Sequence, residues 1–242
     1  MPVLHHKRYG AGQPVVFLGS VASTLEMWEP QLNALSHSYD VIALDHRGHG
    51  ESPLIDAPTS VAELAEDVLE TLDQLDVERF SVVGLSLGGA VAQHLSEHSG
   101  RVERAVLMCT APKFGEESTW REREKLTREQ GIAPMVDAIS GLWFSKEFAQ
   151  QQPATVDRFR TMIAGISGIG YAACCTALAV FDRRTSPALP VPTLTIAGDQ
   201  DASTPPDVVA QLGSNSLVVR GGHVPTIESP EEINRALIEF LG

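Results

Sequence analysis

The sequence predicts an α/β fold, in which a mostly parallel sheet is flanked by helices and carries an inserted helical cap. Short apolar runs alternate with helix-like segments through the first part of the chain and again near its end. Between these parts no strand pattern occurs, and charged or amphipathic helical stretches take its place. A serine with glycines close on both sides joins one apolar run directly to a helix. We therefore expect a core of residues 1–110 and 189–242, with residues 111–188 inserted as the cap.

The apolar runs indicate buried strands, expected at residues 15–18, 39–44, 80–85, 104–109, 192–198 and 216–219. A short helix is expected at residues 28–35. A longer helix follows Ser60, which forms a capping box with Glu63 ahead of an apolar stripe of helical spacing. The last helix is expected to begin at Pro230, with Ser229 and Glu232 as a second capping box.

The composition is typical of a globular protein with an acidic surface. Of the 242 residues 43% are hydrophobic, no apolar run is long enough to cross a bilayer, and the net charge is −13. We therefore expect no nucleic-acid partner and no membrane partner. The N-terminus lacks a signal-peptide pattern, and Cys109, Cys174 and Cys175 suit buried, reduced thiols, so a cytoplasmic protein is expected. The sequence leaves the oligomeric state open, a homo-oligomer included.

Ser86 is the best candidate for a nucleophile. It lies at the centre of Gly-Leu-Ser-Leu-Gly, where an apolar strand stops and a helical pattern begins at once. This is the strand–turn–helix that a G-x-S-x-G nucleophile elbow requires. The glycines allow a sharp turn, and the serine backbone is expected to store about 1–3 kcal/mol of strain. The alternative is a glycine-rich turn with a solvated serine, which the flanking strand and helix disfavour.

A serine hydroxyl needs a base to take its proton, and the base needs an acid to orient it. His223 follows the last expected strand, from where its loop can reach the carboxyl ends of the other strands. The acid is expected between Ser86 and His223 in the chain. Asp199 and Asp201 both qualify, and we favour Asp201.

The oxyanion of a tetrahedral intermediate needs two N–H donors. Leu87, at the start of the helix, and Val21, in the loop after the first buried strand, are expected to supply them. His46 and His49 compete with His223 for the role of base. Because they precede the serine in the chain, we expect them to fix loops instead.

These motifs resemble those of the α/β-hydrolases, and within that superfamily those of the 3-oxoadipate enol-lactonases of bacterial aromatic-compound breakdown. The resemblance covers nearly the whole chain. The general features are DHRGHG at 45–50, GLSLGG at 84–89, Gly198-x-x-Asp201 and Gly222-His223. The more specific features are LEMW at 25–28, Trp143-Phe144 and GYAACC at 170–175.

Two departures from the family pattern occur near the N-terminus. The segment before Val15 is about one strand shorter than usual, so the sheet is expected to lack its first edge strand. Gly19-Ser20 stands where the family usually has His-Gly, so the family pattern alone does not fix which N–H of this loop points inward.

The resemblance implies hydrolysis of a small anionic lactone, a five-membered enol-lactone with a carboxymethyl-type arm, to 3-oxoadipate through an acyl-enzyme. It implies a catalytic triad of Ser86, Asp201 and His223 and no metal or organic cofactor. A guanidinium is the best partner for the substrate carboxylate, although surface salt bridging is the alternative for each arginine. The residues expected to contact substrate are Ser20, Arg47, Trp143, Arg158, Arg160 and Tyr171.

Other functions remain as alternatives. A carboxylesterase, or a hydrolase of carbon–carbon bonds in ring-cleavage products, would share the triad and differ only in the cap. A non-catalytic ligand receptor on the same fold is disfavoured because nucleophile, base, acid and elbow glycines are all present.

Overall fold

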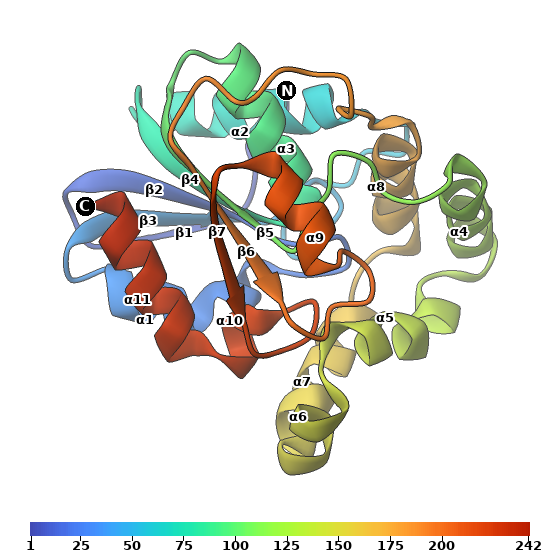
Figure 1. The fold of residues 1–242 in the computed structure, drawn as a ribbon. Helices are drawn as coiled ribbons and strands as arrows, with labels where there is room; N and C mark the ends of the chain where they lie inside the picture. Colours follow the sequence, from blue (N-terminus) through green and yellow to red (C-terminus); the bar gives the residue numbers. More distant parts are fainter.

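A computed structural model describes residues 1–242 and contains one seven-stranded sheet (Figure 1). The strand order is β1-β3-β2-β4-β5-β6-β7, and only β1 runs antiparallel to its neighbour. The strands are β1 His6–Tyr9, β2 Gln13–Leu18, β3 Tyr39–Leu44, β4 Phe80–Leu85, β5 Val102–Met108, β6 Thr193–Gly198 and β7 Asn215–Val219. A parallel sheet brings the carboxyl ends of its strands to one edge, where sites form in folds of this class.

Every expected strand is present, with bounds within two residues of the prediction. The sequence did not predict β1, an edge strand formed by the short segment before Val15. Its four residues are polar and mostly exposed, so they show none of the apolar alternation that marks a strand.

Helices cover both faces of the sheet, with α2 and α3 on one face and α1 and α11 on the other (Figure 1). The core helices are α1 Glu29–Leu35, α2 Val61–Gln74, α3 Leu87–His98, α9 Pro206–Val209, α10 Pro225–Glu228 and α11 Pro230–Leu241, with 3-10 turns η1 Leu25–Trp28 and η3 Ala210–Leu212. The capping box of Ser60 and Glu63 is confirmed. The second capping box was wrong, because the Ser229 hydroxyl donates to the Arg220 carbonyl and makes no cap bond.

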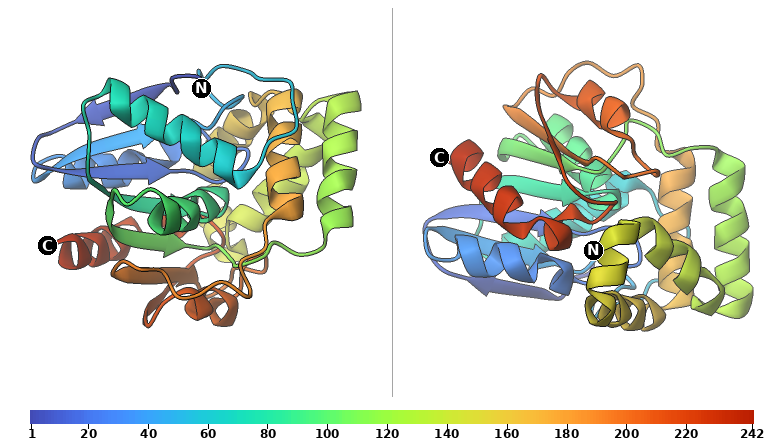
Figure 2. Two further views of the ribbon diagram at one scale, coloured as in Figure 1. Left: turned by 90° about the horizontal axis from the view of Figure 1, so that it is seen from above. Right: turned by 60° about the horizontal axis from the view of Figure 1, so that its bottom comes forward.

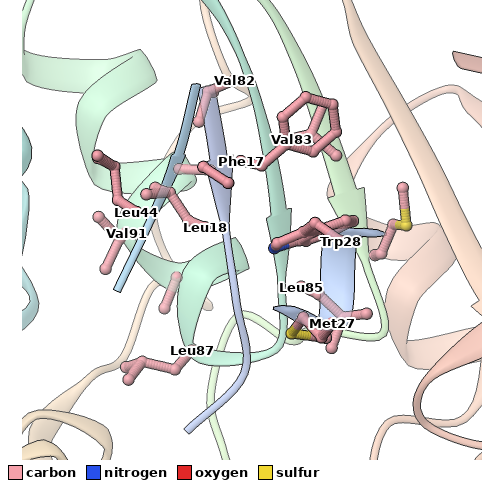
Figure 3. Close-up of a cluster of buried hydrophobic side chains, with 14 of the residues drawn as sticks. Phe17, Leu18, Met27, Trp28, Leu44, Val82, Val83, Leu85, Leu87 and Val91 are labelled. Carbon is pink, nitrogen blue, oxygen red and sulfur yellow. The ribbon is translucent and has the colours of Figure 1, made fainter. Parts of the chain in front are cut away.

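The core forms on both faces of the central strands. Phe17 and Val83 project to the face that carries Trp28, whereas Leu18 and Val82 project to the face covered by α3 (Figure 3). The rings of Phe17 and Trp28 lie 5.2 Å apart. All five side chains are fully buried, so the strands that end at the candidate site are held rigidly from both sides.

Five helices lie between β5 and β6, beyond the carboxyl ends of the strands (Figure 2). They are α4 Glu117–Gln130, α5 Val136–Trp143, α6 Lys146–Gln151, α7 Pro153–Ala164 and α8 Gly168–Val180, with the 3-10 turn η2 Ala133–Met135 before α5. We call residues 111–188, which contain them, the cap. Helices α4 and α8 lie side by side, and α8 is almost entirely buried. No single helix is long and apolar enough to cross a membrane; α7 and α8 meet that test only as a pair bent by 90°.

The cap is bonded directly to the loop between β7 and α10. The Val224 N–H donates to the Trp143 carbonyl over 3.0 Å. The Glu228 carboxylate accepts from the Ser145 hydroxyl at 2.6 Å, the Ser145 N–H at 2.9 Å and the Gly222 N–H at 2.8 Å. These bonds join the α5–α6 corner of the cap to the core, and we call them the Glu228 junction.

Candidate active site

Ser86 occupies a sharp turn between β4 and α3. Its backbone has φ 57° and ψ −114°, outside the regions that ordinary residues favour. A Cβ at Gly84 would lie 2.2 Å from the Gly88 carbonyl oxygen, and one at Gly88 would lie 2.0 Å from the Leu18 carbonyl oxygen. Only glycine therefore fits at both positions, and the turn holds the serine at the end of the central strand.

His223 and Asp201 form a buried hydrogen-bonded pair. His223 Nδ1 lies 2.8 Å from Asp201 Oδ2, and the two residues are 5% and 3% exposed. Asp201 follows β6, and its carboxylate also accepts from the Thr204 hydroxyl at 2.6 Å and from the N–H groups of Ser203 and Thr204. Burial opposes ionisation of this carboxyl, but the histidine and these hydrogen bonds outweigh burial and lower the pKa of Asp201.

Asp199, the other candidate acid, lies elsewhere. It is exposed, and its carboxylate accepts from the Gly221 N–H at 2.9 Å. The structure therefore pairs His223 with Asp201. Asp199 instead stabilises the loop that contains Gly221.

One cavity brings these residues together. It has a volume of about 320 Å³, a size typical of small-molecule sites, and Ser86 and His223 both line it. No hydrogen bond joins their side chains in this structure. Catalytic bonds of this kind are often long until substrate binds. Among the residues expected to contact substrate, Ser20, Trp143 and Tyr171 line this cavity.

Two backbone N–H groups, those of Leu87 and Val21, have no acceptor in the protein. Leu87 is the first residue of α3, so its N–H has no partner within the helix. Val21, which lines the cavity, lies in a turn closed by a bond from the Ser23 N–H to the Ser20 carbonyl, and its own N–H is also unpaired. An oxyanion hole requires two unpaired N–H groups near the nucleophile; Leu87 follows Ser86 directly, and Val21 lines the same cavity.

His46 and His49 hold the loop that carries Val21. His46 Nε2 lies 3.0 Å from the Gly19 carbonyl oxygen, to which it donates. His49 Nε2 accepts from the Ala22 N–H at 3.1 Å, so His49 must be neutral, with its proton on Nδ1 beside the Arg47 carbonyl. Both rings are buried, and they fix the loop as expected from their place in the chain.

The unfolding free energy should decrease as the pH falls, because His49 binds a proton more readily in the unfolded state. Burial, with help from His46, lowers the pKa of His49 to about 4, whereas an unfolded histidine titrates near 6.5. The unfolded state therefore binds the proton first as pH falls, and stability decreases between these two values. We expect His49 to account for a loss of about 2 kcal/mol of unfolding free energy from pH 7 to pH 5.

Urea denaturation at both pH values measures this loss. His49→Gln keeps an acceptor for the Ala22 N–H but cannot titrate, so its unfolding free energy should fall less than that of the wild type. Equal losses in the two proteins would show that His49 does not titrate as the burial of its ring implies.

A match between the sequence and a family model agrees with the fold and with the site geometry. Residues 3–236 match the model of the alpha/beta hydrolase family. The chain belongs to this family. Membership accounts for the mostly parallel sheet, the elbow and the order of Ser86, Asp201 and His223 along the chain.

Relatives of this hydrolase include lactonases and other enzymes. It is 32% identical to 3-oxoadipate enol-lactonase 2 of Acinetobacter baylyi, over 98% of this chain and 97% of the relative. The crystal structure of the enol-lactonase from Burkholderia xenovorans LB400 superposes with a TM-score of 0.94 at 30% identity, over 98% and 96% of the two chains. A putative carbamate hydrolase of Variovorax paradoxus is 29% identical, over 98% and 96%.

The three arginines expected to bind a substrate carboxylate do not line the cavity of this hydrolase. Arg47 is buried and forms a bidentate ion pair with Asp67 of α2, with N···O distances of 2.5 and 2.7 Å. Arg158 lies on the outer side of α7 and pairs with Glu29 at 2.9 Å. Arg160 pairs with Asp137 at 2.5 Å. Each guanidinium is therefore paired with a carboxylate of the protein, in a buried pair for Arg47 and in surface pairs for Arg158 and Arg160.

Arg123 of α4 is the arginine that does line the cavity, and the sequence analysis did not single it out. It is half-buried, and its guanidinium carbon lies 4.8 Å from the centre of the Trp120 ring. The sequence pattern that could have identified Arg123 is its spacing from Trp120. Residues three positions apart lie on one face of a helix, so the arginine and the aromatic ring are neighbours there.

One side-chain group has the composition of a metal site. The ligand atoms of Cys109, Asp201 and His223 lie within 4.8 Å of one another. Asp201 and His223, however, direct their facing atoms at each other. Burial, followed by the Asp201 charge, raises the pKa of Cys109, so the thiol stays protonated and is a poor metal ligand. The donor chemistry of this group does not suit a metal.

Proposed function

We propose that this protein is a serine hydrolase that opens the ring of 3-oxoadipate enol-lactone and releases 3-oxoadipate. The observation that carries the proposal is that Ser86, Val21 and His223 line one cavity, with His223 hydrogen-bonded to Asp201. The lactone is proposed because relatives that match nearly the full chain bear the name enol-lactonase. Trp143 and Tyr171, which belong to the cap motifs of the resemblance, also line the cavity.

In the proposed acylation step, Ser86 Oγ attacks the lactone carbonyl while His223 Nε2 takes its proton. Asp201 stabilises the imidazolium through the Nδ1 bond. The N–H groups of Val21 and Leu87 stabilise the oxyanion. Collapse breaks the ring C–O bond and expels an enolate, which is a better leaving group than an alkoxide. The imidazolium returns its proton to the enolate, and tautomerisation gives the ketone.

In the proposed deacylation step, a water molecule attacks the acyl-enzyme. His223 takes one proton from this water, and the same N–H groups stabilise the second oxyanion. Collapse expels Ser86 Oγ, which recovers the proton from His223. The sum is one lactone and one water giving one 3-oxoadipate, and no step needs a cofactor.

Turnover of two substrates tests the proposal. We expect kcat/KM of about 10⁵ M⁻¹ s⁻¹ or more for the enol-lactone. For p-nitrophenyl acetate, which lacks the carboxylated arm and its binding energy, we expect a value at least about 100-fold lower. A preference for the acetate ester would favour a carboxylesterase. If neither compound is hydrolysed and a serine-directed phosphonate forms no adduct, the protein is a ligand receptor on this fold.

A further inference from the structure

The loop that contains His223 contacts the cap on both sides of the histidine. On one side, Gly222 lies so close to the α5–α6 corner that a Cβ there would be 2.8 Å from the Trp143 carbonyl oxygen. On the other side, the Val224 N–H donates to the same carbonyl over 3.0 Å. The cap corner therefore determines where the backbone of His223 lies, while Asp201 orients its ring through Nδ1.

Glu228, the last residue of α10, bonds the loop to the cap through a single carboxylate (Figure 1). Its Oε1 accepts from the Gly222 N–H at 2.8 Å and from the Ser145 N–H at 2.9 Å. Its Oε2 accepts from the Ser145 hydroxyl at 2.6 Å. Hydrogen bonds to an ionised, half-buried carboxylate are stronger than those between neutral groups. Glu228 thus fixes the residue directly before the proposed general base.

The cap corner is itself rigid. Trp143 and Phe144 are buried, and their rings pack edge-on against the Phe159 ring of α7, with centres 6.1 and 5.3 Å apart. The Phe144 ring also stacks on that of Phe148 in α6, with centres 5.4 Å apart. Because three helices of the cap meet in these contacts, the corner holds Ser145 and the Trp143 carbonyl in fixed positions.

Neither Ser145 nor Glu228 lines the cavity, so neither contacts a ligand there. Any effect that they have on the reaction must pass through His223. Its Nε2 has to come within about 3 Å of the Ser86 hydroxyl for proton transfer. A displacement of about 1 Å at a reacting group can lower a rate by about 100-fold, so the position of this loop matters for the rate.

We propose that Glu228 is a positioning residue for the general base, and that it acts by holding the loop of His223 on the cap corner. The cap then contributes to the rate of the chemical step as well as to the walls of the cavity. The inference rests on the proposed function in one respect, the role of His223 as the base. It applies to any ester or lactone that the enzyme hydrolyses, because the bonds of the Glu228 junction do not face the cavity.

Glu228→Met removes all three hydrogen bonds and keeps a side chain of similar length. We expect kcat for p-nitrophenyl acetate to fall by about 30-fold and KM to stay within about twofold, because the base is displaced and the cavity is not. Glu228→Gln should keep kcat within about threefold of the wild type. Its Oε1 can accept from both N–H groups, and its NH₂ can donate to the Ser145 oxygen. Steady-state kinetics per active site, with sites counted by a fluorophosphonate, measure both effects.

Ser145→Ala tests the junction from the cap side and with a smaller change. It removes one of the three bonds, so kcat should fall by about fivefold. Because both residues act through one junction, the double variant should be no slower than Glu228→Met alone. Glu147→Met is the matched control. Glu147 pairs with Arg220, so it also joins the cap to the end of β7, but on the exposed surface, and its loss should leave kcat unchanged.

The outcomes separate this inference from the proposed function. If Glu228→Met and Ser145→Ala both keep kcat within threefold, the inference is wrong and the proposed function stands. Equal losses in Glu228→Gln and Glu228→Met would also overturn it, because the hydrogen bonds that glutamine retains would then not matter.

If the wild type hydrolyses neither ester nor lactone, the rate constant of phosphonate labelling takes the place of kcat, since labelling needs only Ser86 and its base. Labelling of Glu228→Met that is about 30-fold slower would then support the inference and leave only the proposed function wrong. A wild type that is not labelled at all has no active base at His223, and both would fall.

Discussion

Ser86→Ala should lower kcat by about 10⁴-fold or more for any ester or lactone that the wild type hydrolyses. The variant loses the only atom that forms the proposed acyl-enzyme, while the two unpaired N–H groups and the cavity remain. The fold should survive, because the turn is held through the Ser86 backbone: its N–H donates to Met108 at 3.0 Å and its carbonyl accepts from Thr110 at 2.8 Å. We expect the unfolding free energy to change by no more than about 0.5 kcal/mol.

Steady-state kinetics and covalent labelling measure this effect together. A fluorophosphonate should add once to the wild type and not at all to Ser86→Ala, as read by intact-protein mass. Ser20→Ala is the labelling control, since Ser20 lines the same cavity but lies in the preceding loop, and this variant should still be labelled. Turnover by Ser86→Ala within tenfold of the wild type would rule out Ser86 as the nucleophile.

Asp201→Asn should lower kcat by about 10³- to 10⁴-fold. An asparagine amide presents no charge to stabilise the imidazolium, and its NH₂ group can turn towards His223 Nδ1 and favour the wrong tautomer. The pH dependence of kcat gives a second measurement. Because its hydrogen bonds and His223 lower the pKa of Asp201, the wild type should keep this acid ionised to a pH below the usual range of aspartate.

Asp199→Asn is the matched control for this prediction. Asp199 lies two residues earlier and accepts from the Gly221 N–H through one oxygen, a role that an asparagine carbonyl can also fill. Its kcat should stay within about threefold of the wild type. A larger loss in Asp199→Asn than in Asp201→Asn would reassign the acid.

The parts of the site that could be predicted from sequence are those that follow from short sequence motifs and from positions at the ends of strands. The elbow at Ser86 follows from glycines at fixed spacing between a strand and a helix, and the structure has that turn. The pairing of His223 with Asp201 follows from their positions after the last two strands of a parallel sheet. His46 and His49 were expected to fix loops, and each bonds to the loop before η1.

The arginine that lines the cavity could not be predicted because its position depends on which way a helix faces. Arg47 follows a strand that ends at the site, yet its side chain turns back to Asp67. Arg158 and Arg160 lie on an amphipathic helix whose buried face carries Phe159 instead. Helix α4 is so rich in charge that sequence alone does not mark its inner face; its packing against α8 does, and that packing turns Arg123 to the cavity.

The Glu228 junction has a consequence for protein engineering. Relatives of this hydrolase differ in substrate, and a chimera that replaces residues 111–188 with the insert of a relative is an obvious route to a new specificity. Such an exchange would also remove the Ser145 groups and the Trp143 carbonyl that hold the segment on both sides of His223. A functional chimera therefore has to keep these two anchor positions, because the same insert that lines the cavity also holds the loop of His223, the proposed general base.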